Sequence, residues 1–485
     1  MDFQMNLSKK EAEHRKTMQL LFLIAAGIVQ FPFVLVDALY PGWGYFLAEK
    51  FLAIPCLLFF GSALCQRLST TAKWTMLLSG AMILWFAVAQ TQHHMNHMLV
   101  RNFGIFAVVY LLAFPFAAVT EDEKTGLNWI GWIYTAFSLL LVGFAMMLQL
   151  DILPEFLQDG VVWDGARASL IWHPNGTACI LMLGIGFSLY FLVQADKKWK
   201  KWVMAVLIAL QFLTISLTNS RTSIFLTCAL IGGTVFFVIW KGGWKRFLAG
   251  AAAALAVILA LLCIYTALFD AHEQIQIDKL LKEQEVQQKT EEMMAQTAPA
   301  ETSAETEAPQ ETQPKKTTQS LKVNKKTGKV TIVGSGSSGQ KELSKDMKSL
   351  NGRTKIWKAA FTAVQDNPSI KLWGTEYAAL EISNRNSFPV VNAHNSWIQI
   401  MMVLGLPSLL MALVFTLIAV CGIWRLMWQP HGDTGKKVVA MIVICLLVAS
   451  ILETYLFLGE MPTSFANFAF FLCTGYLLHW NLKKG

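Results

Sequence analysis

The chain has 485 residues, of which 54% are hydrophobic and only 15% are charged, and its formal net charge at pH 7 is +8. Soluble domains carry about 25% charged residues. This composition, with a mean hydropathy of +0.45, cannot supply a water-facing surface for a chain of this length. It excludes a soluble globular enzyme, a disordered protein and a secreted disulfide scaffold, and it indicates a membrane protein that crosses the bilayer several times.

Twelve apolar segments are long enough to cross a bilayer, for which a helix needs about 20 residues. They cover residues 18–38, 45–65, 74–90, 102–119, 128–150, 173–194, 202–217, 222–240, 247–269, 395–423, 438–458 and 463–480. The first is too long for a signal peptide and has no small-residue cleavage site, so we expect it to stay as an anchor. The sequence therefore predicts an all-α integral membrane protein with about 12 transmembrane helices.

Basic residues are distributed unequally between the alternate ends of these segments. With a cytoplasmic N-terminus, the short outer loops and helix ends hold only four, Lys50, Arg101, Arg167 and Arg221. The cytoplasmic ends hold nineteen: Lys9, Lys10, Arg15, Lys16, Arg67, Lys73, Lys124, Lys197, Lys198, Lys200, Lys201, Lys241, Lys245, Arg246, Arg425, Lys436, Lys437, Lys483 and Lys484. Because cytoplasmic loops are enriched in Lys and Arg, both termini are predicted to be cytoplasmic. Such short clusters do not indicate nucleic-acid binding.

This topology divides the chain into three regions. Residues 1–270 hold the first nine helices, residues 271–394 form a large extracytoplasmic loop between the ninth and tenth helices, and residues 395–485 hold the last three. Within the loop, 271–290 has the composition of a polar helical extension, and 291–349 is rich in Thr, Glu, Gln, Lys and Ser. The second composition is typical of disordered linkers, although the short KVTIV segment favours a strand. Residues 350–394 regain an apolar pattern, and we expect order there.

The ordered part of the loop begins with an amphipathic helix. Apolar residues recur at helical spacing around Trp357, Asn351 is a suitable N-cap, and Asn367-Pro368 is a suitable stop. Arg353 lies one turn before Trp357 and therefore at the edge of the apolar face. We expect a helix on the membrane surface whose arginine points inward.

Several charged and polar residues lie at the predicted outer face, against the general charge bias. Arg167 precedes the sixth span, Ser220 and Arg221 begin the eighth, Arg353 lies in the loop, and His394 and Asn395 begin the tenth. Spans six, eight and ten run from outside to inside, so their N-termini present unpaired N–H groups to the outer face. Arginine side chains add paired donors that match phosphate oxygens. The pattern predicts a phosphate or pyrophosphate site at the outer leaflet.

Each of these residues also has a plainer interpretation. An arginine at a membrane end often extends toward lipid phosphates, and a single histidine is more often a hydrogen-bonding residue at a helix end than a catalyst. Their grouping on one face favours a site. His394, at a helix N-terminus beside arginines, is expected to be neutral near pH 7 and able to accept a proton from an attacking hydroxyl. Glu453 and Glu460, near the outer end of the eleventh span, are the rival bases.

No metal or cofactor site is predicted. His93, His94 and His97 include a pair at i and i+4, but no carboxylate lies nearby, and the eight cysteines show no metal-ligand spacing. The cysteines lie within or at the edges of apolar segments, where small core residues are usual. His173, before Pro174, is interpreted as a residue that helps to start the sixth span.

Four segments together resemble the O-antigen ligase and polymerase superfamily of bacterial envelope glycosyltransferases. They are RASLIWHPNGTA, LTNSRTSIFL, NGRTKIWKAAFTAVQDNPSIKLWG and AHNSWIQIMMVLGLPSLL, all within residues 165–415. The predicted helix count and the loop between helices nine and ten are also similar to this family. The chain departs from it where Gly374 is followed by Thr375-Glu376 instead of a second glycine, and in the long linker 291–349.

The resemblance implies a metal-independent, GT-C-like transferase without a cofactor. Its donor is a glycan on undecaprenyl pyrophosphate, used at the outer face of the plasma membrane. By position, Arg221 and Arg353 hold the pyrophosphate, Arg167 makes a further donor contact, and His394 activates the acceptor hydroxyl. Ser220, Asn395 and Glu453 are the remaining candidate substrate-binding residues.

Several reactions and one other class of protein stay open. Ligation to a lipid core, polymerisation onto another lipid-linked unit and transfer to protein Ser or Thr share one donor, and surface-polysaccharide ligation or polymerisation is favoured. The alternative class is a polysaccharide or lipid transporter, or flippase. Ion-coupled transport generally needs ionisable groups near the bilayer centre, whereas Asp37, Glu49, Lys50 and Glu453 lie toward outer ends. A third reading, a membrane scaffold whose loop binds cell-wall material, needs no arginine cluster.

Overall fold

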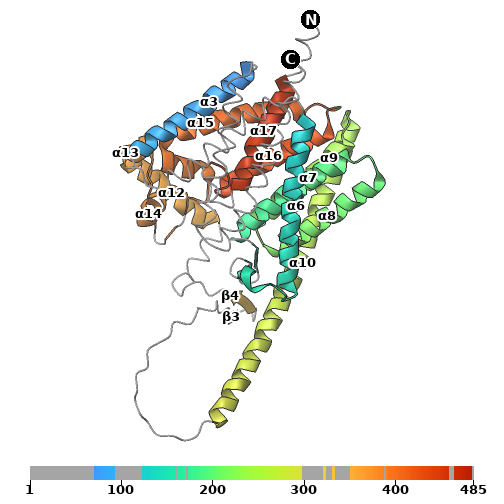
Figure 1. The fold of residues 1–485 in the computed structure, drawn as a ribbon, viewed down its shortest axis with the longest axis vertical. Coiled ribbons are helices and arrows are strands. Elements are labelled where there is room, and N and C mark those ends of the chain that lie inside the picture. Colours follow the sequence, from blue (N-terminus) through green and yellow to red (C-terminus); the bar gives the residue numbers. More distant parts are fainter. Residues whose placement is uncertain are drawn as a thin grey trace, which may run out of the picture.

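The computed structural model describes eleven segments of the chain. They are residues 70–92, 123–158, 161–164, 167–170, 173–297, 320–323, 330–333, 350–386, 389–390, 392–457 and 464–482. They are mostly helical (Figure 1). The predicted spans 18–38, 45–65 and 102–119 lie outside these residues, as do Lys50, Arg101, Glu460 and the three histidines His93, His94 and His97.

Every predicted span that falls on described residues coincides with a helix. The helices are α3 (Thr70–Gln92), α6 (Glu123–Gln149), α7 (Pro174–Gln194), α8 (Lys198–Leu217), α9 (Arg221–Ile239), α10 (Trp244–Thr297), α15 (Ser396–Met427), α16 (Thr434–Leu452) and α17 (Ser464–Leu482). By length and composition, seven of the described helices can cross a membrane, and α3 and α17 hold shorter apolar stretches. The described residues therefore show an all-α membrane protein, as predicted.

Helix α7 lies at the centre of the bundle and is buried from its start to Tyr190, apart from the partly exposed Asn175. Small residues let its neighbours approach closely, as is usual between helices in membranes. A Cβ on Gly184 would lie 2.2 Å from Ser138 Oγ of α6, and one on Gly186 would lie 2.7 Å from the Ile442 side chain of α16. This packing fixes where the N-terminus of α7 meets the end of α16.

The long loop contains more regular structure than its composition indicated. α10 continues past its apolar part to Thr297, which confirms the helical extension over 271–290 (Figure 1). Strands β3 (Ser320–Val323) and β4 (Val330–Val333) pair antiparallel, so the KVTIV segment does form a strand. They are followed by α12 (Leu350–Asp366), α13 (Pro368–Trp373) and α14 (Ala378–Asn384). α12 begins one residue before the predicted cap Asn351, and Asn367 both ends α12 and caps α13.

The loop helices pack against the first part of α15 through two glycines. Gly374 (φ +81°) follows α13, and Gly405 (φ +79°) interrupts α15, which the sequence predicted as one continuous helix. A Cβ on Gly405 would lie 2.1 Å from the Leu372 carbonyl oxygen, and one on Gly374 would lie 2.3 Å from the Val403 carbonyl oxygen. Both the backbone conformation and the lack of space require glycine. The contact holds the first part of α15, and the residues before it, against the loop.

Candidate functional site

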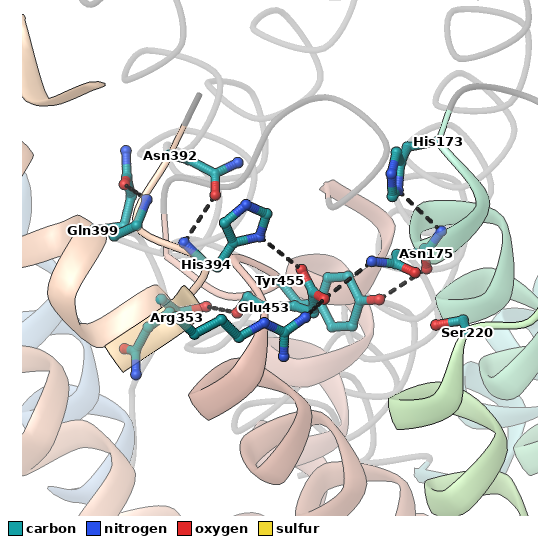
Figure 2. A network of polar contacts seen from close by, with 12 residues as sticks. His173, Asn175, Ser220, Arg353, Asn392, His394, Gln399, Glu453 and Tyr455 are labelled. Atoms are coloured by element: carbon teal, nitrogen blue, oxygen red, sulfur yellow. Dashed lines mark hydrogen bonds and ion pairs between the residues drawn. The ribbon is translucent and has the colours of Figure 1, made fainter. Parts of the chain in front are cut away.

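The Glu453 carboxylate is the centre of a polar network where α7 and α15 begin and α16 ends (Figure 2). α16 ends at Leu452, earlier than the predicted span 438–458, so Glu453 has an extended backbone (φ −145°, ψ 160°). Its oxygen Oε1 accepts hydrogen bonds from Arg353 Nη2 at 2.5 Å and from Asn175 Nδ2 at 3.0 Å. Its oxygen Oε2 lies 3.4 Å from His394 Nδ1. One buried carboxylate therefore joins residues from three parts of the chain.

His394 has a left-handed backbone (φ 46°), which few residues other than glycine adopt. Such a conformation costs about 1–3 kcal/mol and persists only where the surroundings determine it. Here the Asn392 side chain accepts a hydrogen bond from the His394 N–H at 2.9 Å, and the neighbouring Ala393 N–H donates to Gln399 Oε1 at 2.9 Å (Figure 2). Trp357 Nε1 of α12 donates to the Ala393 carbonyl at 3.1 Å. The chain around His394 is thus held from both sides.

Asn395 and Ser396 fasten this turn to the chain that follows α16. Asn395 caps α15, because its Oδ1 accepts hydrogen bonds from two backbone N–H groups of the first turn, and its Nδ2 donates to the Ile451 carbonyl at 2.9 Å. Ser396 Oγ donates to the Glu453 carbonyl and accepts from the Leu456 N–H, both at 3.0 Å. The positions of His394 and Glu453 are therefore fixed relative to each other by the backbone.

Arg167 reaches the same network from a short hairpin, β1 (Val162–Asp164) with β2 (Arg167–Ser169). Its Nε donates to the Thr218 carbonyl at 2.9 Å, and its Nη2 donates to Asn175 Oδ1 at 3.0 Å. The Asn175 amide then donates to Glu453. Asn175 consequently bridges an arginine on one side and the carboxylate on the other.

Tyr455, in the segment after α16, holds the backbone of Asn175 in place. Its hydroxyl donates to the Asn175 carbonyl at 2.8 Å, and Ser223 of α9 is a second hydrogen-bonding neighbour. Burial raises the pKa of the Tyr455 phenol well above its ordinary value, with Glu453 acting in the same direction. The hydroxyl therefore stays protonated and remains a donor.

Arg221 is the first residue of α9 and is exposed. Within the described residues it has no hydrogen bond or ion pair, in contrast to Arg353. The Tyr265 hydroxyl donates to Asn219 Oδ1 at 2.5 Å, and the Thr218 carbonyl accepts the hydrogen bond from Arg167. Both bonds hold the short segment just before Arg221, so Arg221 stands beside the Arg167 end of the network.

The structure thus brings most of the predicted site residues together. Arg167, Arg353, His394 and Glu453 share one connected network, Asn395 fixes its geometry, and Ser220 and Arg221 stand at the adjacent start of α9. Ser220 is buried, with its Oγ 3.3 Å from Ser223 Oγ. His173 caps α7 and accepts a hydrogen bond from the Asn175 N–H at 3.3 Å, so its predicted role in starting this helix is confirmed (Figure 2).

Sequence reasoning did not identify Asn175 or Tyr455. Asn175 carried a usable signal, because a side-chain amide at the second residue of an apolar helix, beside Pro174, needs a polar partner. Tyr455 carried none, since it fell within a predicted span. In the described part of the chain, no three His, Cys, Asp or Glu side chains are grouped as metal ligands are.

Comparison with known proteins gives one family. Residues 206–413 match a family model described as O-antigen ligase. The matched segment contains Arg221, Arg353, His394 and Asn395, whereas Arg167 and Glu453 lie outside it. The chain matches no curated protein.

Proposed function

We propose that this chain, which matches an O-antigen ligase family model over residues 206–413, transfers a glycan from undecaprenyl pyrophosphate to an acceptor hydroxyl. The family supports a role in ligation or polymerisation of surface polysaccharide. The reaction takes place at the outer face of the plasma membrane, with both termini cytoplasmic. The observation that carries the proposal is one connected network beside the start of α9: Arg353 and His394 contact the Glu453 carboxylate directly, and Arg167 reaches it through Asn175.

The donor pyrophosphate lies against Arg221 and Arg167. Arg221 is exposed and begins a helix, so its guanidinium and the unpaired N–H groups of the first turn can bind the same anion. Arg167 is already held by Thr218 and Asn175, which fixes its charge in place before the donor arrives. Arg353 forms an ion pair with Glu453, so less of its positive charge is available to bind the donor pyrophosphate.

Fixed positive charge is what this reaction requires, because a pyrophosphate leaving group develops negative charge as its bond breaks. The acceptor oxygen attacks the anomeric carbon of the donor sugar while the bond from that carbon to the phosphate oxygen breaks. The electron pair of the broken bond leaves with the pyrophosphate. The proton of the acceptor hydroxyl passes to His394 Nε2, which has no hydrogen-bond partner within the described residues.

Asn395 and Ser220 position the site instead of contacting substrate. The Asn395 side chain is buried, its Oδ1 accepts two backbone hydrogen bonds, and its Nδ2 donates to the Ile451 carbonyl. Ser220 precedes Arg221 and is buried against Ser223. No step of the proposed reaction needs a metal.

Mass spectrometry of lipid-linked glycans in a deletion strain tests this function. Accumulated single repeat units on the carrier indicate a polymerase, and accumulated long chains on the carrier indicate a ligase. Accumulation must occur at the outer face, where added glycosidases reach it; accumulation at the cytoplasmic face would indicate a flippase and contradict the proposal. Complementation with the intact chain, but not with His394→Ala, should restore the normal profile.

A further inference from the structure

The contacts of the Glu453 carboxylate determine which nitrogen of His394 carries hydrogen. A carboxylate accepts hydrogen bonds and does not donate them. Its Oε1 already receives Arg353 and Asn175, and its Oε2 faces His394 Nδ1. A neutral imidazole in this place therefore carries its hydrogen on Nδ1 and leaves the lone pair on Nε2. This is the tautomer that can take a proton from an acceptor hydroxyl.

The backbone maintains this arrangement without help from a ligand. The Glu453 carbonyl accepts a hydrogen bond from Ser396 Oγ at 3.0 Å, and Asn395 donates to the Ile451 carbonyl at 2.9 Å. The left-handed backbone at His394, just before α15, directs the imidazole toward the Glu453 carboxylate (Figure 2). The 3.4 Å between Nδ1 and Oε2 is longer than an ordinary N–H···O bond, and hydrogen bonds at catalytic sites often tighten only once substrate is bound.

Accessibility separates the two side chains. The Glu453 side chain is 9% exposed, and two donors occupy one of its oxygens, whereas the His394 side chain is 29% exposed. An acceptor hydroxyl entering the site meets the imidazole before the carboxylate. Glu453 is also an anion, paired with Arg353, and its negative charge repels a pyrophosphate.

We propose that Glu453 is a positioning residue that orients His394 and fixes its Nδ1–H tautomer, and is neither the base nor a ligand of the substrate. This inference rests on the proposed transferase function. When His394 Nε2 accepts the proton, Nδ1 keeps its own, and the resulting imidazolium faces the Glu453 carboxylate. The other charged group that faces this pair is Arg353 of α12, and Arg167 is linked to the Glu453 carboxylate through Asn175. The negative charge of Glu453 stabilises the imidazolium and the two guanidinium groups.

A double-mutant cycle on the full-length protein in proteoliposomes tests the proposal. Transfer from a synthetic polyprenyl-pyrophosphate glycan is measured for wild type, Glu453→Gln, His394→Ala and the double variant. We expect His394→Ala to lower kcat by about 10²–10⁴-fold. We expect Glu453→Gln to lower kcat by at least about tenfold, but by no more than His394→Ala does. We expect the double variant to be no slower than His394→Ala, because residues that act as a unit are non-additive.

Two further readouts separate positioning from general support of the fold. The donor KM should stay the same or fall in Glu453→Gln, because a negative charge beside the guanidinium groups has been removed. The acid limb of the pH–rate profile should move to lower pH, because the imidazolium loses its counter-charge. Glu381→Gln is the matched control. Glu381 forms an ion pair with Arg385, with 2.5 Å between Oε2 and Nη1, and this pair is not part of the network around Glu453. The control should change neither the donor KM nor the pH–rate profile.

Opposite results overturn the inference in distinct ways. If Glu453→Gln slows the His394→Ala variant further, Glu453 acts independently, as a base or through substrate. If the donor KM rises, Glu453 belongs to the donor site. If Glu453→Gln folds poorly, Glu453→Asp replaces it, because aspartate keeps the charge but shortens the side chain. We expect the kcat of Glu453→Asp to lie between those of wild type and His394→Ala. A kcat equal to wild type, with an unchanged pH–rate profile, refutes the positioning role. Wild-type rates in His394→Ala instead refute the base assigned in the proposed function.

Discussion

Replacing Arg221 by lysine keeps the positive charge at the start of α9 but removes the flat, two-donor face of the guanidinium. In the structure this side chain is exposed and has no ion-pair or hydrogen-bond partner among the described residues. Its loss therefore leaves no buried group unpaired, and the fold should be unaffected. The effect should appear only when the anionic donor is bound.

The magnitude follows from the bonds that lysine cannot make. A hydrogen bond to a charged group is worth roughly 1.5–3 kcal/mol, and a lysine ammonium is a point charge that does not match two phosphate oxygens at once. Losing one such bond in the transition state lowers kcat/KM by about ten- to one-hundredfold, at about 1.4 kcal/mol per tenfold change. Because the pyrophosphate gains charge as it leaves, part of this loss should appear in kcat.

The assay measures initial rates of glycan transfer in proteoliposomes at several donor concentrations, with protein amount and melting temperature recorded for each variant. Arg246→Lys is the control, since Arg246 is also exposed and lies in the first turn of the neighbouring helix α10. We expect wild-type rates for it. Wild-type kcat/KM in Arg221→Lys would refute the two-donor role, and an equal loss in Arg246→Lys would show that the effect is not specific to the site.

Three further predictions concern the packing around the site. Gly405→Ala should lower the free energy of unfolding by about 2 kcal/mol or more, and with it the melting temperature, because the added Cβ would lie 2.1 Å from the Leu372 carbonyl oxygen. Gly143→Ala is the control and should not lower the melting temperature, because no atom lies within 4 Å of its added Cβ. Similar melting curves for the two variants would contradict the close contact at Gly405. Asn395→Ala removes the cap of α15 and should cost about 0.5–2 kcal/mol together with most of the transfer rate; a stable variant at full rate would disprove its role in holding the turn. For Tyr455, burial raises the phenol pKa in the fold, so stability is complete below the unfolded value of about 10 and falls as pH rises above it; Tyr455→Phe should weaken this alkaline loss, and an unchanged pH dependence of the melting temperature would contradict it.

The sequence predicts well those features that depend on local composition. Apolar runs of sufficient length gave the described helices, and the amphipathic pattern around Trp357 located α12. The positions of Arg167, Arg221 and His394 near helix starts followed from the same segments, because a polar residue beside an apolar run marks where a helix begins. Such signals are contained in a few neighbouring residues.

Features that depend on tertiary contacts were not predictable. No glycine or proline lies near Leu452, so nothing marks the early end of α16 that places Glu453 in the network. The break at Gly405 depends on a backbone approach from Leu372, which belongs to a different helix. Asn175 joins the network only because Arg167 and Glu453, far apart in the chain, meet on either side of its amide.

The most direct test of the transferase mechanism measures both products of one turnover. Purified protein in proteoliposomes receives a labelled polyprenyl-pyrophosphate glycan and an acceptor, and released polyprenyl pyrophosphate is counted against glycan joined to the acceptor. We predict one carrier released for each glycan transferred, with both products lost in Arg221→Ala and in His394→Ala, and with donor still bound by the His394 variant. Movement of the intact lipid-linked glycan across the bilayer, without release of carrier, would contradict the account.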